Sequence, residues 1–216
     1  YDSYSCRKWK WTSFWVKRIE KFIRSCSDNY KENCYILKLD ISWYFMSIDK
    51  DILFEKIKKV LKCHYLASNY CHYPAWPDNL ESNNQLTGYS GQARVWQEGI
   101  EYYNFIIYLI KEIIYNDPTK NSIFKWKRSD YIWLPKNKSL FFAKQNTWLP
   151  IWNLTSQLFS NIYLSDFDKY VKEELKIKYY GRYVDDFVII HKDKNYLKEV
   201  IKEINKYLKY NLWLNL

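Results

Sequence analysis

The chain has 216 residues, of which 48% are hydrophobic, and it carries a formal net charge of +10. This length suits a single domain, and the apolar fraction is large enough for a core. The longest apolar run, residues 105–110, is too short to cross a bilayer, so the sequence predicts no membrane span.

Charge and cysteine content narrow the class of protein further. The positive charge favours nucleic acid or an anionic membrane surface as a partner, although a lysine-rich composition from an AT-rich genome explains it equally well. Five cysteines without a recognisable secretory signal predict reduced thiols and a cytoplasmic location. The chain lacks an initial Met and stops abruptly at Leu216, so we expect a piece of a longer protein.

The hydrophobic pattern predicts an α+β fold, with helices packed on one face of a small antiparallel sheet. A strand over 34–41 is β-branched and apolar, which indicates burial. Asp49 is a candidate N-cap for the helix that follows. In chain order we predict helix 14–26, strand 34–41, a helix after Asp49, loop 66–95, helix 98–115, loop or short strand 116–148, helix 154–176, strands 178–183 and 187–190, and helix 195–210.

Three acidic residues lie where these predicted strands end. Asp40 ends the first strand, and Asp185 and Asp186 occupy the tip of the hairpin. Burial and like-charge repulsion oppose the ionisation of neighbouring carboxylates unless a cation is present. Oxygen ligands of this kind suit Mg²⁺, and two such ions support phosphoryl transfer. For an isolated Asp-Asp pair, a solvated hairpin turn is the commoner explanation.

The surrounding residues carry a resemblance to reverse transcriptases. Residues 183–186 read YVDD and resemble the family's Tyr-x-Asp-Asp signature. Residues 37–45 (LKLDISWYF) and 149–157 (LPIWNLTSQ) resemble its first and second palm motifs, in the family's order and spacing. The resemblance implies a polymerase palm, part of a right-hand architecture. Residues 1–216 would then be a reverse transcriptase domain fragment, the palm with the end of the fingers, lacking N-terminal fingers and C-terminal thumb.

A narrower resemblance points to bacterial diversity-generating retroelements. It is carried by residues 1–8, 134–140 and 153–164, and by the branched Ile151 in the second motif. It implies a bacterial enzyme that copies an adenine-containing template RNA with many errors. Its partners would be an RNA template, a DNA or RNA primer, dNTPs and a small basic accessory protein. A group II intron, retron or defence-type enzyme, and a non-catalytic palm-like RNA-binding protein, are the alternatives.

The resemblance also implies roles for single residues. The acids Asp40, Asp185 and Asp186 would be catalytic and would hold two Mg²⁺ ions, with Mn²⁺ as a possible substitute, and the Ile41 backbone would lie beside the metals and the triphosphate. Phe45, five residues after Asp40, matches the steric gate against a ribose 2′-OH, although a core aromatic is the alternative. The remaining expected contacts are Ile151 and Gln157 to the nucleotide, and Arg7, Lys8, Lys10, Trp152 and Tyr183 to the primer or template. The three basic residues could equally be a solvated loop.

Tryptophan stands at several positions where the family pattern has glycine. The chain has 11 Trp and only 4 Gly, whereas glycine normally makes up about 7% of residues. We hypothesise that UGA encodes glycine in the source organism and has been translated as Trp; a decayed gene copy is the alternative. The positions concerned are Trp9, Trp11, Trp15, Trp43, Trp148 and Trp152, and Trp213 is a further candidate.

Histidine and cysteine offer two weaker sites. The pairs Cys63-His64 and Cys71-His72 could suggest zinc, but their spacing is not that of a zinc site. We interpret His191 as a strand-end residue.

Overall fold

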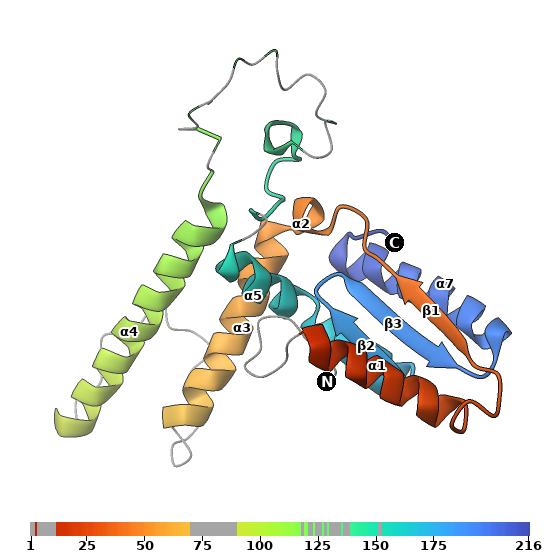
Figure 1. The fold of residues 1–216 in the computed structure, drawn as a ribbon. Helices are drawn as coiled ribbons and strands as arrows, with labels where there is room; N and C mark the ends of the chain where they lie inside the picture. Colours follow the sequence, from red (N-terminus) through yellow and green to blue (C-terminus); the bar gives the residue numbers. More distant parts are fainter. Residues whose placement is uncertain are drawn as a thin grey trace. The chain divides into compact units, whose positions relative to one another are not determined.

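A computed structural model describes residues 3, 12–69, 90–117, 119–120, 123, 127, 129, 135, 139–150 and 153–216, without the side chains of 64–69 and 90–99. Helices and a single three-stranded sheet make up this described part (Figure 1). The elements are α1 (Thr12–Cys26), β1 (Tyr35–Leu39), α2 (Tyr44–Ser47), α3 (Lys50–Asn69), α4 (Ser90–Tyr115), a 3₁₀ turn (Leu140–Phe142), α5 (Leu154–Tyr163), α6 (Ser165–Lys169), a π-helical turn (Tyr170–Glu174), β2 (Tyr179–Tyr183), β3 (Asp186–His191) and α7 (Lys194–Leu212).

The chain divides into two units. The first comprises residues 1–53 and 118–216 and contains the sheet, and the second comprises residues 54–117. Within the second unit, the Phe54 and Tyr115 rings meet edge to face with centroids 5.9 Å apart. The three acidic residues of the predicted site all belong to the first unit.

The sheet is antiparallel, with β3 at its centre in the order β1-β3-β2. Residues 187–190 of β3 are all buried, as expected for a strand covered on both faces. The strand β1 forms an edge, and Tyr35 and Ile36 are 40% and 54% exposed. The prediction that this strand is buried is therefore wrong: its apolar residues reflect strand propensity rather than a place in the core.

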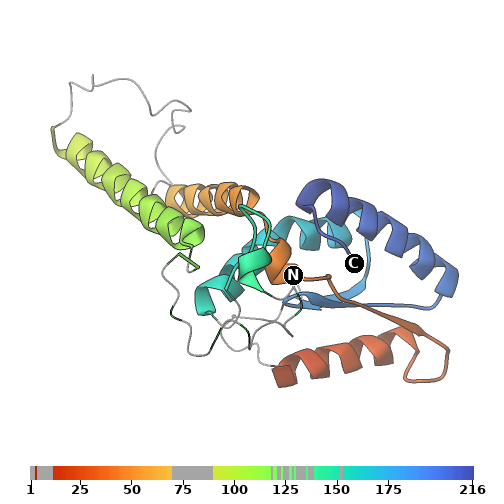
Figure 2. The ribbon, with the colours of Figure 1, turned by 90° about the horizontal axis from the view of Figure 1, so that it is seen from above.

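Helices cover both faces of the sheet. Val188 and Ile190 pack against Phe22 and Cys26 of α1. On the opposite face, the Phe187 ring lies 5.4 Å from that of Phe167 in α6. Figure 2 shows the sheet edge-on between α1 and α7. The predicted α+β fold with an antiparallel sheet is confirmed, and α1 adds a helix on the face that we expected to be uncovered.

Several helices depart from their predicted bounds. The helix α3 continues to Asn69 and α4 begins at Ser90, so both helices include residues of the predicted loop 66–95. The predicted helix 154–176 is interrupted: α5 ends at Tyr163, and a π-helical turn follows α6. No helix in the described residues has both the length and the apolar content needed to cross a membrane.

Candidate active site

A two-residue turn joins β2 to β3 and carries the acidic pair. Tyr183 pairs with Asp186 across the hairpin, which leaves Val184 and Asp185 at its tip. Val184 has a φ of 58°, in the left-handed region that a β-branched residue seldom adopts. The turn that presents Asp185 is therefore strained and must be held by its surroundings.

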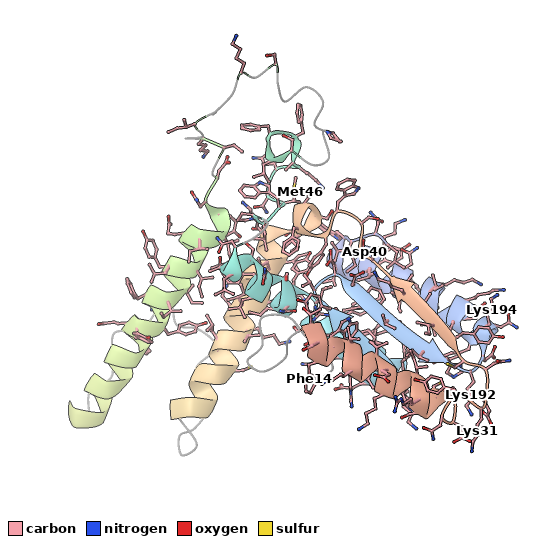
Figure 3. The ribbon with its side chains drawn as sticks, in the orientation of Figure 1. Phe14, Lys31, Asp40, Met46, Lys192 and Lys194 are labelled. Carbon is pink, nitrogen blue, oxygen red and sulfur yellow. The ribbon has the colours of Figure 1, made fainter. Side chains whose placement is uncertain are left out.

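The first acid lies beside this turn. The register of β1 with β3 ends at Leu39 opposite Phe187, so Asp40 follows at the level of Asp186. Figure 3 labels Asp40 at this end of the sheet, with Lys192 and Lys194 at the other end. Partial burial raises the pKa of the Asp185 carboxyl, and the charges of Asp40 and Asp186 raise it further, while backbone hydrogen bonds oppose the shift. The strand register thus brings Asp40 to the same end of the sheet as the turn that carries Asp185.

The carboxylates have the chemistry for a divalent cation, but they are not gathered around a preformed site. A cation would offset the repulsion that opposes ionisation of Asp185, and carboxylate oxygens are suitable ligands for Mg²⁺. However, the described residues contain no group of three His, Cys, Asp or Glu positioned to hold a metal. Asp186 instead forms an ion pair with Lys38, at 3.1 Å between Nζ and Oδ1. Metal binding therefore requires a movement of these side chains.

Backbone hydrogen bonds join the two palm motifs. The amide of Leu149 donates to the Phe45 carbonyl at 2.7 Å, and that of Trp148 to the Ile48 carbonyl at 3.0 Å. In addition, the side chain of Asp49 caps α3, accepting from the Ile52 amide at 3.0 Å, as predicted. The start of the second motif therefore lies directly against the end of the first.

The remaining predicted site residues fall into two groups. Ile41 is buried, Gln157 is half-buried on α5, and the hydroxyls of Tyr183 and Thr12 lie 3.3 Å apart. Phe45 is half-buried and meets the Tyr44 ring edge to face, at 5.4 Å between centroids. The predicted contacts at Arg7, Lys8, Lys10, Ile151 and Trp152 lie outside the described residues.

A buried ionic network behind the hairpin was missed by the sequence reasoning. Arg182, 1% exposed, forms a bidentate pair with Asp168, at 2.9 Å from Nε to Oδ1 and 2.6 Å from Nη2 to Oδ2. The Tyr180 hydroxyl also donates to Asp168, at 2.6 Å. The available signal was a charged residue at an inward position of each element: Arg182 in an apolar strand, and Asp168 next to the core residue Phe167.

The weaker candidates have little support. Cys63 is exposed on α3, whereas Cys71 and His72 lie outside the described residues. His191 ends β3, as interpreted, and its Nδ1 accepts a hydrogen bond from the Asp193 amide at 3.0 Å.

Solved structures identify the fold. The chain is similar to apo telomerase from Candida tropicalis truncated from its C-terminal domain, with 18% identity and a TM-score of 0.51. It is also similar to telomerase from Candida albicans in complex with a TWJ fragment of telomeric RNA, with 15% identity and a TM-score of 0.54. These matches cover 99% of this chain but only 34% and 30% of the two telomerase chains. No protein-family model and no curated protein matches the sequence. The fold is therefore reverse-transcriptase-like, with the palm that the motifs predict.

Proposed function

We propose that this chain is the palm of an RNA-directed DNA polymerase, which adds deoxynucleotides to a primer on an RNA template. The observation that carries the proposal is the position of Asp40 beside Asp185 on the strained turn, within a reverse-transcriptase-like fold. The three acids come from two segments that are about 145 residues apart in the chain, and the antiparallel register brings them to the same end of one sheet. A solvated hairpin turn does not account for this convergence.

Each acid has a distinct part in the proposed reaction. Asp40 and Asp185 would each bind both Mg²⁺ ions. Asp186 would complete the site once its ion pair with Lys38 is broken. The side chains of Lys38 and Asp186 are 67% and 42% exposed, so their ion pair is weak and easily exchanged. When bound, two metal ions stabilise the attacking and leaving oxygens of an in-line displacement.

The other residues would bind and orient the substrates. The Ile41 backbone would lie beside the triphosphate, and Phe45 would exclude a ribose 2′-OH. Phe45 is suited to that role because it is only half-buried and its backbone is tied to the second motif. For the remaining predicted contacts we keep the proposed roles: Ile151 and Gln157 at the nucleotide, Tyr183 and Trp152 at the primer and template, and Arg7, Lys8 and Lys10 at phosphates.

We further propose that the protein copies the template RNA of a bacterial diversity-generating retroelement with many errors, and that a basic accessory protein is its partner. RNA as a partner is supported by the telomerase neighbour, which was solved with a fragment of telomeric RNA. A template repeat and a variable repeat beside the gene would distinguish this element from a group II intron, retron or defence-type enzyme. The presence of all three acids argues against a non-catalytic RNA-binding palm.

Primer extension by the full-length gene product tests the proposal. Asp185→Asn should reduce extension about 100-fold or more, the size expected when a group that stabilises the transition-state charge is removed. The control is Asp193→Asn, which makes the same chemical change at the N-cap of α7, where Asn caps equally well. Equal extension by Asp185→Asn and the unsubstituted protein would refute the assigned site. RNA binding without any extension would favour the non-catalytic alternative.

A further inference from the structure

The buried network behind the hairpin contains one contact that reaches the active-site turn itself. Arg182 Nη1 donates to the carbonyl of Val184 at 2.8 Å and to Asn161 Oδ1 at 3.1 Å. The rest of the guanidinium is occupied by Asp168 through the bidentate pair. One buried side chain therefore connects α6 to the strained residue that precedes Asp185.

The charge of Arg182 is fully compensated where it lies. Burial acts against the charge, but the charge and hydrogen bonds of Asp168 outweigh it, so the pKa of Arg182 lies above its ordinary value. In the described residues, no buried side-chain nitrogen or oxygen lacks a hydrogen-bond partner. The planar guanidinium has a fixed orientation when it is held by a bidentate carboxylate. Its Nη1 group is consequently a rigid donor, directed at the turn.

We propose that Arg182 is a positioning residue, which fixes the Val184 carbonyl and thereby the direction in which Asp185 presents its carboxylate to the metals. This inference rests on the proposed function. The carbonyl of Val184 belongs to the peptide group that leads directly into Asp185, so a rotation of this peptide would redirect the Asp185 side chain. Val184 itself has a left-handed φ of 58°, which is costly for a β-branched residue, so the turn needs fixed contacts of this kind to keep its conformation.

The decisive variant removes the donor without leaving a buried charge. Arg182→Met alone would strand the Asp168 carboxylate in the core, and its effect would be mainly on folding. The triple variant Asp168→Leu, Tyr180→Phe, Arg182→Met replaces the pair and its hydroxyl partner with apolar side chains, an exchange that folded proteins often tolerate. Arg182→Lys is a second variant: it keeps the charge beside Asp168, but a single ammonium lacks the planar fork that joins Asp168 to Val184.

The matched control is Tyr180→Phe. It removes one hydrogen bond to Asp168, at 2.6 Å, but leaves the Arg182 contact with the Val184 carbonyl in place. A purely structural network would lose stability in this variant as well. A positioning role predicts that its metal affinity is unchanged.

The measurement is Mn²⁺ binding to the metal-free full-length protein, followed by electron paramagnetic resonance, together with thermal unfolding. We expect the triple variant and Arg182→Lys to fold and to bind Mn²⁺ about 10-fold more weakly. Substitution of residues that support metal ligands commonly lowers the metal affinity by this amount. Mn²⁺ binding as tight as that of the unsubstituted protein in either folded variant would overturn the inference. If Asp185→Asn also bound Mn²⁺ normally, there would be no metal site at this turn, and both the proposed function and the inference would fail.

Discussion

At the scale of single residues, the backbone gives an independent test of the tryptophan hypothesis. Trp43, Trp148 and Trp213 have φ values of 52°, 84° and 55°, in the region where glycine is the usual residue. Trp15 lies inside α1, so nothing in its backbone calls for glycine. Trp9, Trp11 and Trp152 lie outside the described residues. Three tryptophans thus occupy glycine-type conformations, including Trp213, which the motifs only suggested.

Glycine substitutions should separate these positions by their effect on stability. Trp43 and Trp213 are 45% and 61% exposed, so replacing either with Gly removes left-handed strain and loses less buried surface than at a buried tryptophan. We expect a gain of about 1 kcal/mol in the free energy of unfolding for Trp213→Gly, and a smaller gain for Trp43→Gly, because Trp43 is covered to a greater extent. The control Trp15→Gly should cost at least about 1 kcal/mol, because glycine weakens a helix interior and the indole packs against the core cluster that contains Phe22 and Cys26. Denaturant unfolding measures all three, and a loss of stability in both Trp43→Gly and Trp213→Gly would contradict the hypothesis.

Trp148 combines strain with burial. It is 7% exposed, and the Lys50 ammonium lies 3.9 Å from its ring centroid. Deleting a buried indole costs about 3–5 kcal/mol, more than left-handed strain can return, so this position is a poor test by stability. The codon gives the direct answer here: UGG at position 148 would mean that the tryptophan is genuine.

At the scale of elements, sequence periodicity identified most helices and strands. It did not identify the places at which tertiary contacts interrupt a helix. The 3.6-residue spacing predicts a buried face of α7 at Leu197, Val200, Ile201, Ile204 and Leu208; four of these residues are buried, and Ile201 is half-buried. The break after Tyr163 has no such local signal. The helices α5 and α6 meet at Leu164, with ψ of 4°, and α6 then places Asp168 against Arg182. A pairing between residues 14 positions apart, on a helix and a strand, depends on how the elements pack and cannot be deduced from either segment alone.

The strand β1 also holds a residue that should regulate metal binding. Lys38 pairs with Asp186, so Lys38→Met would free this carboxylate for a metal. Because an exposed ion pair contributes less than about 1 kcal/mol, we expect the Mg²⁺ concentration for half-maximal extension to fall by up to about fivefold. Lys192→Met is the matched control, since Lys192 is also exposed and pairs with Glu32 at the other end of the sheet (Figure 3). A higher Mg²⁺ requirement in Lys38→Met would show that Lys38 assists binding, contrary to this prediction.

At the scale of the whole molecule, the cluster of acids should make the protein less stable than it could be. The pKa of Asp185 is raised in the folded state, so the unfolded chain releases this proton at a lower pH. Stability is therefore lost as the pH rises from the ordinary Asp value through the folded one, because ionised Asp185 lies partly buried beside Asp40 and Asp186. Without a bound cation, this acidic site lowers the stability of the folded protein. Such a loss of stability is a common cost of function.

This linkage gives a prediction with opposite signs in the absence and presence of metal. With a chelator at neutral pH, Asp185→Asn should unfold at a higher temperature than the unsubstituted protein, and the difference should vanish when the pH falls below the ordinary pKa of Asp. With Mg²⁺ at about 100 times its dissociation constant, the unsubstituted protein should gain about 2.7 kcal/mol, whereas the variant gains much less. Thermal unfolding with and without Mg²⁺ measures both effects, with Asp193→Asn as the control. If Mg²⁺ stabilised Asp185→Asn as much as the unsubstituted protein, the ion would bind elsewhere. The three acids would then not form a metal site, and the proposed polymerase function would lose its main support.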